Sequence, residues 1–311
     1  MARKPAPPLE TVTLSGLPDE AVPAYEAALE SVCRSVAFSL DEATGHWTLE
    51  AVRGQGVKDA ELEAALALAA AVTGHAAEAR RAPVEAEGWL ARTAEAFPEQ
   101  RIGRRLLLRP THVPDGPSGG RIVLRLDAGL AFGSGEHNST RGCLMAFERL
   151  APLRPRHDRR RTPRILDLGA GSGVLGLYAA AWLKRPVELT DIEPWSVRVA
   201  QQNAAMNGLR HLVRARVADG WRVRWLRGRR FDLVFANILA RPLCAMARSL
   251  ATHLAPGGVA VLAGLLGSQA RMVIAAHRRA GLRLVERRDH GAWTTLVVRR
   301  RNGKPPPATR G

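Results

Sequence analysis

Along the second half of the chain, short apolar runs alternate with longer amphipathic segments. A short apolar run bounded by turn residues predicts a buried strand, and apolar positions three or four residues apart predict a helix. We expect strands at residues 165–167, 187–191, 213–218, 231–236, 259–263, 282–286 and 294–298. We expect helices that run up to Leu183 and over 194–207, 239–254 and 268–280. This regular alternation predicts an α/β domain with a mostly parallel, doubly wound sheet.

The last two of these strands are joined only by residues 287–293. Parallel neighbours need a crossover connection of about a dozen or more residues, so this last pair should be antiparallel. A seven-stranded sheet of this kind differs from the six-stranded sheet of dinucleotide-binding domains.

The N-terminal part has a different pattern. We expect strands at 11–17, 35–40 and 46–52 and helices at 19–31 and 58–72. This order predicts a small α+β domain of ferredoxin-like type, which we assign to residues 9–75. Its residues form no convergent polar cluster, so we expect it to recognise a substrate or to act as a scaffold.

Between the two domains we expect a linker at residues 76–120, which contains an apolar strand at 105–109 and ends in a Pro- and Gly-rich loop. The larger domain should then span 121–299. Residues 300–311 include three consecutive prolines and should form a disordered tail.

The chain is strongly basic. Four of its 46 Lys plus Arg residues are lysines, which leaves 42 arginines against 29 acidic residues and a formal charge of +17. Such a surplus favours a polyanionic neighbourhood such as RNA. An arginine-rich composition produces the same count without that partner. We therefore expect contact with RNA through the basic surface to be incidental.

The cysteines and apolar runs limit the choice of compartment. Cys33, Cys143 and Cys244 lie far apart without zinc-ligand spacing, which predicts neither a metal site nor a disulfide framework. The N-terminus lacks an apolar signal core, and the longest apolar-rich run, residues 60–72, is too short to cross a bilayer. We expect a cytoplasmic protein with no membrane partner.

The segment that runs from Asp167 through Gly169 and Gly171 to Gly173 follows an apolar strand and opens an apolar helix. Glycines there allow a sharp turn and close approach of the backbone to a ligand. Residues from Gly171 to Gly176 also match GxGxxG, so a nicotinamide dinucleotide is one interpretation. Asp167 favours a different ligand, because a carboxylate suits an ammonium group and would repel the pyrophosphate of a dinucleotide. We predict S-adenosylmethionine as the cofactor.

Two further acids follow the next two strands. Asp191 ends the second strand, where an acidic residue can accept hydrogen bonds from both ribose hydroxyls. An acid is expected here for S-adenosylmethionine and for a nicotinamide dinucleotide, so Asp191 does not distinguish them. The alternative is that Asp191 caps the following helix. Asp219 follows the third strand and is placed to receive an adenine amino group, although an Asp before a glycine is often only a turn residue.

Asn237 follows the fourth strand, at the edge where α/β folds bind ligands. An attacking nitrogen must point its lone pair at the methyl carbon, and an Asn carbonyl can hold its N–H groups so that it does. A hydride-transfer enzyme does not need this group. The alternative is a polar strand-end residue bonded to backbone. We predict that Asn237 aligns the nucleophile.

Three motifs together resemble the PrmA family, which methylates ribosomal large-subunit protein L11. They are Leu126-Asp-Ala-Gly-Leu-Ala-Phe-Gly-Ser-Gly-Glu-His-Asn-Ser-Thr140, the glycine loop after Asp167, and Asn237-Ile-Leu-Ala240. The resemblance covers nearly the whole chain. It implies a class I methyltransferase domain, a ferredoxin-like recognition domain, a linker that begins near Trp89, and methylation of lysine or N-terminal α-amino groups of a ribosomal protein.

By the same resemblance, a loop covers the methionine end of the cofactor. This loop contains Phe132, Gly133, Ser134 and Gly135, with His137 and Thr140 nearby. The family usually has Thr at the positions of Ser134 and Ser139, and both replacements keep a hydroxyl. Glu136 and the arginine surplus are less usual for the family, which leaves the protein substrate more open than the cofactor.

Two other functions remain as alternatives. An RNA base N-methyltransferase would suit the basic charge, but its Asn motif usually continues with two prolines and an aromatic ring, whereas here Ile-Leu-Ala follows Asn237. A nicotinamide-dependent oxidoreductase is the other alternative. We expect a protein methyltransferase that works as a monomer.

Overall fold

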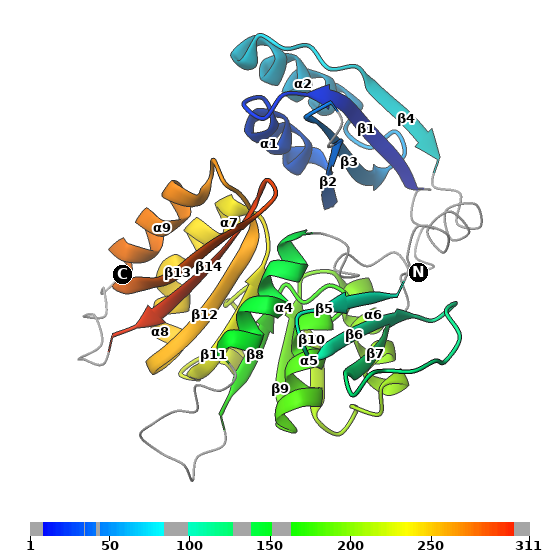
Figure 1. Ribbon diagram of the computed structural model, residues 1–311. Coiled ribbons are helices and arrows are strands. Elements are labelled where there is room, and N and C mark those ends of the chain that lie inside the picture. Colours follow the sequence, from blue (N-terminus) through cyan, green and yellow to red (C-terminus); the bar gives the residue numbers. More distant parts are fainter. Residues whose placement is uncertain are drawn as a thin grey trace, which may run out of the picture. The chain divides into compact units, whose positions relative to one another are not determined.

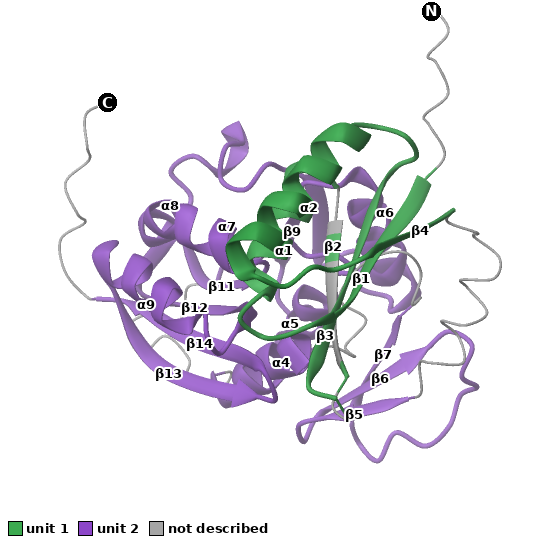
Figure 2. Cartoon of the chain, turned by 90° about the horizontal axis from the view of Figure 1, so that it is seen from above, with its two compact units in different colours: residues 1–91 green, residues 92–311 purple. Residues whose placement is uncertain are grey.

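The computed structural model describes residues 9–33, 35–41, 44–83, 99–126, 138–150 and 163–301. The chain divides into two compact units, residues 1–91 and 92–311, which Figure 2 colours separately.

Unit 1 is a four-stranded antiparallel sheet with two helices. Its elements are β1 (Leu9–Leu17), α1 (Val22–Val32), β2 (Ser35–Asp41), β3 (His46–Gly54), α2 (Asp59–Thr73) and β4 (Ala79–Pro83). The strand order is β2-β3-β1-β4, and the two helices pack against each other beside the sheet (Figure 1). This is the ferredoxin-like arrangement that the sequence predicts.

Strand β4 is not predicted by the sequence. It pairs antiparallel with β1, so the small sheet extends beyond residue 75 into the segment that the sequence assigns to the linker. All but the first of its five residues are exposed. It therefore has no alternation of apolar and polar positions, and its arginines and its proline are typical of an edge strand.

A three-stranded sheet opens the described part of unit 2. It contains β5 (Gln100–Ile102), β6 (Leu106–Pro110) and β7 (Ile122–Leu126), of which β6 and β7 are parallel. Ile102, Leu106 and Leu124 are buried in the same apolar cluster as the first helices of the larger sheet. Most of the second half of the predicted linker thus packs as part of unit 2.

The main sheet of unit 2 has seven strands in the order β10-β9-β8-β11-β12-β14-β13. Its strands are β8 (Ile165–Leu168), β9 (Val187–Asp191), β10 (Val213–Val217), β11 (Phe231–Asn237), β12 (Leu254–Leu266), β13 (Leu282–His290) and β14 (Trp293–Arg300). Strand β14 is antiparallel to both its neighbours, and the pairs from β10 to β12 are parallel. The predicted seven-stranded sheet with an antiparallel last pair is confirmed.

Helices cover both faces of this sheet (Figure 1). They are α4 (Asn138–Leu150), α5 (Val174–Leu183), α6 (Pro194–Met206), α7 (Ala240–Ala245), α8 (Ala247–His253) and α9 (Ala270–Arg279). Strand residues alternate between two apolar clusters: Ile165 and Phe235 belong to the cluster with α4 and α5, and Leu166 and Val234 to the cluster with α7 and α8. A strand that is buried on both faces has a continuous apolar sequence, and this is why strands such as β8 and β11 can be predicted from the sequence.

One predicted helix is wrong in detail. Residues 239–254 form two short helices, α7 and α8, because Met246 has a ψ of 1° and interrupts the helical backbone. Leu254 is already the first residue of strand β12, where it pairs with Phe231.

Candidate functional site

The candidate site lies at the carboxyl edge of the main sheet. Strand β8 is flanked by β9 and β11, and all three are parallel, so their carboxyl ends meet at one edge. Asp191 is the last residue of β9, Asn237 is the last residue of β11, and Asp167 is the third residue of β8. The structure thus brings three sequence-predicted site residues to the same edge.

The glycine loop joins β8 to α5 through an unusual backbone. Gly169, Gly171 and Gly173 have φ values of 69°, 52° and 83°, which other residues rarely adopt. The N–H groups of Gly169 and the next residue donate to the Thr190 carbonyl at 2.8 and 2.9 Å, which ties the loop to β9. A Cβ atom at Gly169 would overlap the Cγ2 atom of Ile238. The loop therefore requires glycine both for its conformation and for space.

Asp167 is fully buried beneath this loop. Its Oδ2 atom accepts a hydrogen bond from the Gly176 N–H at 2.8 Å, whereas its buried Oδ1 atom has no partner among the described residues. Burial raises the pKa of this carboxyl to about 7, and the nearby Asp191 carboxylate adds to the rise. A cation beside Oδ1 would offset both effects.

The Asp191 carboxylate orders the start of α6 and the glycine loop together. Its Oδ2 atom accepts from the Gly171 N–H at 2.8 Å, and its Oδ1 atom accepts from the Glu193 N–H at 3.0 Å. Glu193, at the N-cap position of α6, makes no side-chain capping bond. Burial raises the pKa of Asp191 despite these bonds, and the residue remains partly exposed. Its remaining lone pairs are therefore open to a ligand at the sheet edge.

Asn237 is held from the side by helix α4. Its Nδ2 atom donates to the Thr140 hydroxyl at 3.0 Å, and no described residue donates a hydrogen bond to its buried Oδ1 atom. The residue is 8% exposed. A buried carbonyl that lacks a donor is costly in the folded protein, which favours a ligand that supplies an N–H group. The sequence predicts both residues but not their contact.

The remaining predicted residues are less informative. Asp219 lies beyond the end of β10 with its side chain 60% exposed, and it pairs with Arg222 at 3.3 Å. Phe132, Gly133, Ser134, Gly135 and His137 lie outside the described residues.

Two asparagines that the sequence did not predict support the site: Asn203 in α6 and Asn207, the residue that caps the end of this helix. Asn203 is fully buried and donates to the Ser172 carbonyl in the glycine loop at 2.9 Å. Asn207, one turn later, accepts from the Arg125 N–H at 2.8 Å and donates to the Arg125 carbonyl at 2.7 Å. Asparagine is unfavourable inside helices, so Asn203 in the helical pattern, with Asn207 four residues later, is the signal that could have identified this face.

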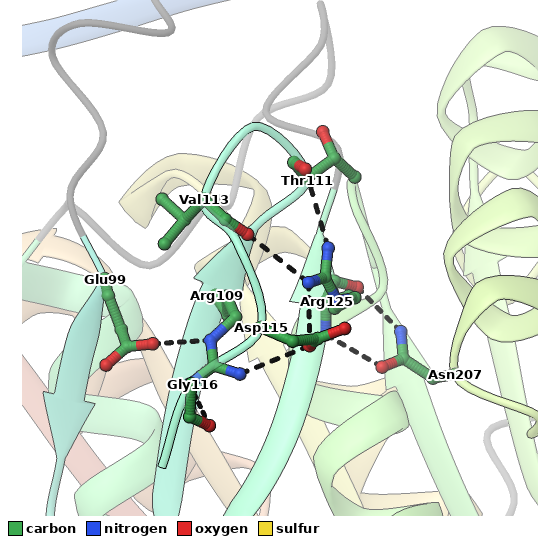
Figure 3. A network of polar contacts seen from close by, with 8 residues as sticks. All are labelled: Glu99, Arg109, Thr111, Val113, Asp115, Gly116, Arg125 and Asn207. Carbon is green, nitrogen blue, oxygen red and sulfur yellow. Dashed lines mark hydrogen bonds and ion pairs between the residues drawn. The ribbon is translucent and has the colours of Figure 1, made fainter. Parts of the chain in front are cut away.

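Arg125 belongs to a polar network that spans the three-stranded sheet (Figure 3). The Asp115 carboxylate accepts from Arg125 at 2.8 Å and from Arg109 at 3.4 Å, and Arg109, 3% exposed, also pairs with Glu99. Helix α6 thus connects this network, through Asn207 and Asn203, to the glycine loop.

Two kinds of feature are absent from the described residues. They contain no group of three or more His, Cys, Asp or Glu side chains that could hold a metal ion. Within the same residues, no helix is both long and apolar enough to cross a membrane.

Comparison with known proteins gives a consistent result. The family model described as ribosomal protein L11 methyltransferase (PrmA) matches residues 29–301. A ribosomal protein L11 methyltransferase of Caulobacter sp. (strain K31) is 36% identical over 279 residues, which cover 89% of this chain and 90% of the relative. Another, of Rhizobium leguminosarum bv. trifolii (strain WSM2304), is 41% identical over 209 residues, or 67% of this chain and 69% of the relative.

Among solved structures, the ribosomal protein L11 methylase of Lactobacillus delbrueckii subsp. bulgaricus is similar with a TM-score of 0.57 and 25% identity. The match covers 66% of this chain and 98% of that one. The class I fold, the family model and the relatives agree: this chain belongs to the PrmA family of S-adenosylmethionine-dependent ribosomal protein L11 methyltransferases.

Proposed function

We propose that this chain methylates amino groups of ribosomal protein L11, on lysine side chains, the N-terminal α-amine or both, and that Asn237 aligns the attacking nitrogen. The observation that carries the proposal is the buried Oδ1 atom of Asn237, which lies at the carboxyl end of β11 and has no hydrogen-bond partner in the part of the chain that the structure describes. The bond from Nδ2 to Thr140 holds the carboxamide so that Oδ1 stays free to accept a hydrogen bond.

The residues of the carboxyl edge fit S-adenosylmethionine. Asp167 offers to the cationic amino group a buried carboxylate oxygen that no other described residue contacts through a hydrogen bond, and the partly exposed Asp191 carboxylate suits ribose hydroxyls. The backbone of Gly169, Gly171 and Gly173 has no side chains that would block a ligand. By family resemblance we add Phe132, Gly133, Ser134, Gly135 and Thr140, and with less support Asp219.

When bound, S-adenosylmethionine supplies a methyl group activated by a sulfonium. The protein has to present an amine whose lone pair is free and aimed at that methyl. Loss of a proton at pH 7 costs roughly 1 kcal/mol for an α-amine and roughly 4.6 kcal/mol for a lysine. The Asn237 carbonyl can accept an N–H of the neutral amine and fix its direction without adding a charge.

Asparagine suits this task better than a carboxylate. A carboxylate would stabilise the ammonium form, whose nitrogen has no lone pair, and would so raise the cost of deprotonation. A neutral amide accepts the same hydrogen bond with a smaller preference for the cation. We assign no general base, and the proton leaves to solvent before attack.

We propose that unit 1 selects the substrate and adds no chemistry, because none of the site residues above belongs to it. Because β4 pairs with β1, a truncation at residue 75 would leave β4 without its partner, so the cut belongs at residue 91. Deletion of residues 1–91 should leave the affinity for S-adenosylmethionine unchanged in calorimetry. Methylation of L11 should fall by about tenfold or more, which corresponds to about 1.4 kcal/mol of lost recognition.

The control for this truncation is a short unmethylated peptide of L11 that contains an amine which the full chain methylates in the intact protein. At high peptide concentration, the truncated and full chains should methylate it at similar rates, because chemistry resides in unit 2. Methylation of intact L11 at the full rate by the truncated chain would contradict the role of unit 1.

We further propose that the protein acts as a monomer in the cytoplasm, where newly made L11 is accessible.

A further inference from the structure

Arginines concentrate in one stretch of unit 2. Seven of the twenty residues from 211 to 230 are arginine, against 42 of 311 in the whole chain, and Asp219 is the single acid among the twenty. We call the exposed face of this stretch the 211–230 surface. It comprises strand β10, at one edge of the main sheet, and the connection through the 3-10 helix Arg224–Leu226 to β11.

Two of these arginines contact the same side chain, the indole of Trp225. The guanidinium of Arg216, on β10, lies 4.8 Å from the centre of the indole ring, and that of Arg229 lies 5.4 Å from it. Both distances are within the range of cation–π contacts. Arg214 shares the face of β10 with Arg216, since residues two apart in a strand point the same way. The indole thus fixes cationic groups from two segments on one side of the sheet edge.

The charge of this surface is not balanced by nearby acids. Arg229 pairs with Glu188 at 3.2 Å, and Arg222 pairs with Asp219 at 3.3 Å. Within the described part of the chain, the exposed residues Arg224, Arg227 and Arg230 form no ion pair. Crowded like charges destabilise a folded protein, and the binding of a polyanion offsets this cost.

We propose that the 211–230 surface binds the phosphate backbone of RNA. Guanidinium groups match phosphate oxygens in a bidentate geometry, and two of them are already ordered by stacking on Trp225, which lowers the entropy lost on binding. The choice of RNA over an acidic protein rests on the proposed function. A ribosomal protein binds RNA through its own cationic groups, so this surface would repel the substrate and attract the RNA on which the substrate assembles.

The test uses the full chain and a labelled single-stranded oligouridylate, with binding followed by fluorescence anisotropy. The test variant combines R224Q, R227Q and R230Q, which removes three exposed charges that form no ion pair with the described residues. The control variant combines R271Q, R278Q and R283Q, exposed residues of α9 and β13 at the other end of the sheet, and removes the same charge. S-adenosylmethionine binding should be unchanged in both variants.

The wild type and the control variant should bind the RNA with similar affinity, whereas the test variant should bind about tenfold or more weakly. The slope of log K against log[salt] is negative, and each phosphate contact on a single strand contributes about −0.7 to it, so the slope should become less negative by about 2 in the test variant alone. Trp225→Leu, which keeps the net charge, should also weaken binding, and Trp225→Phe should restore most of it.

Three results would overturn the proposal. These are no RNA binding by the wild type, equal losses in the test and control variants, and binding of polyglutamate with the same dependence on these arginines. Methylation of free L11 is measured separately and should be normal in the test variant. If the protein methylates L11 but does not bind RNA, the proposed function is supported and the RNA surface is wrong. If it binds RNA through these arginines but does not methylate L11, the RNA surface is supported and the proposed function is wrong.

Discussion

Replacement of Asp167 by Asn should weaken S-adenosylmethionine binding by roughly 10- to 150-fold, the equivalent of a charged hydrogen bond of about 1.5 to 3 kcal/mol. The affinity of the wild type should also rise with pH up to about 7 and then level off, because burial raises the pKa of Asp167 to about 7 and a cationic ligand binds its ionised form. Calorimetry across pH should show this rise in the wild type and not in the variant.

The same substitution should change stability in the ligand-free protein. In the unfolded chain an Asp has a pKa of about 3.9, so unfolding releases a proton from Asp167 between about pH 4 and 7. The free energy of unfolding should therefore fall as pH rises through this window, by up to about 1.4 kcal/mol per pH unit, and level off above it. Asp167→Asn should lack this contribution.

Asp232→Asn is the matched control, since it makes the same chemical change near the amino end of β11, away from the site. It should keep the wild-type affinity for S-adenosylmethionine and the wild-type rise of this affinity with pH. Equal pH profiles for Asp167→Asn and the wild type would contradict the assignment of a buried, titrating carboxylate to the cofactor.

Replacement of Asn237 by Ala should lower turnover by about 5- to 150-fold with S-adenosylmethionine saturating, because a buried hydrogen bond of this kind is worth roughly 1 to 3 kcal/mol. The loss should appear in kcat more than in cofactor affinity, since alignment matters in the transition state. Asn237→Asp keeps an acceptor but favours the ammonium form, so its turnover should recover as pH rises, whereas Asn237→Ala should stay slow.

Thr140 offers a separate test of this geometry. Thr140→Val removes the oxygen that accepts the Asn237 Nδ2–H at 3.0 Å and should lower turnover, whereas Thr140→Ser should keep turnover near the wild-type value.

Wild-type turnover in Asn237→Ala would show that Asn237 only forms hydrogen bonds at the end of its strand. No recovery of Asn237→Asp at high pH would contradict the proposed preference for a neutral amine.

The inner strands of the seven-stranded sheet could be predicted from the sequence because most of their residues are buried, so that these strands appear as apolar runs; they are β8, β9, β11, β12 and β14. Gly169 and Gly173 could also be identified, since only glycine adopts their positive φ values without strain. Strand β4 could not be predicted, because it is an exposed edge strand that depends on its pairing with β1 for its conformation.

The internal contacts of the site could not be predicted either. Thr140 and Asn237 are 97 residues apart, and their hydrogen bond exists only because α4 packs beside β11. The raised pKa of Asp167 depends on burial and on Asp191, neither of which can be read from a motif. Asn203 reaches Ser172 across 31 residues, from a helix that any amphipathic sequence could form.

The most direct measurement of the central claim is mass spectrometry of purified ribosomal protein L11 after incubation with this chain and S-adenosylmethionine. We expect methyl groups on lysine or α-amino nitrogens of L11, and far fewer of them with Asn237→Ala. Methyl transfer to added RNA with none to L11, or no transfer to either despite bound S-adenosylmethionine, would contradict it.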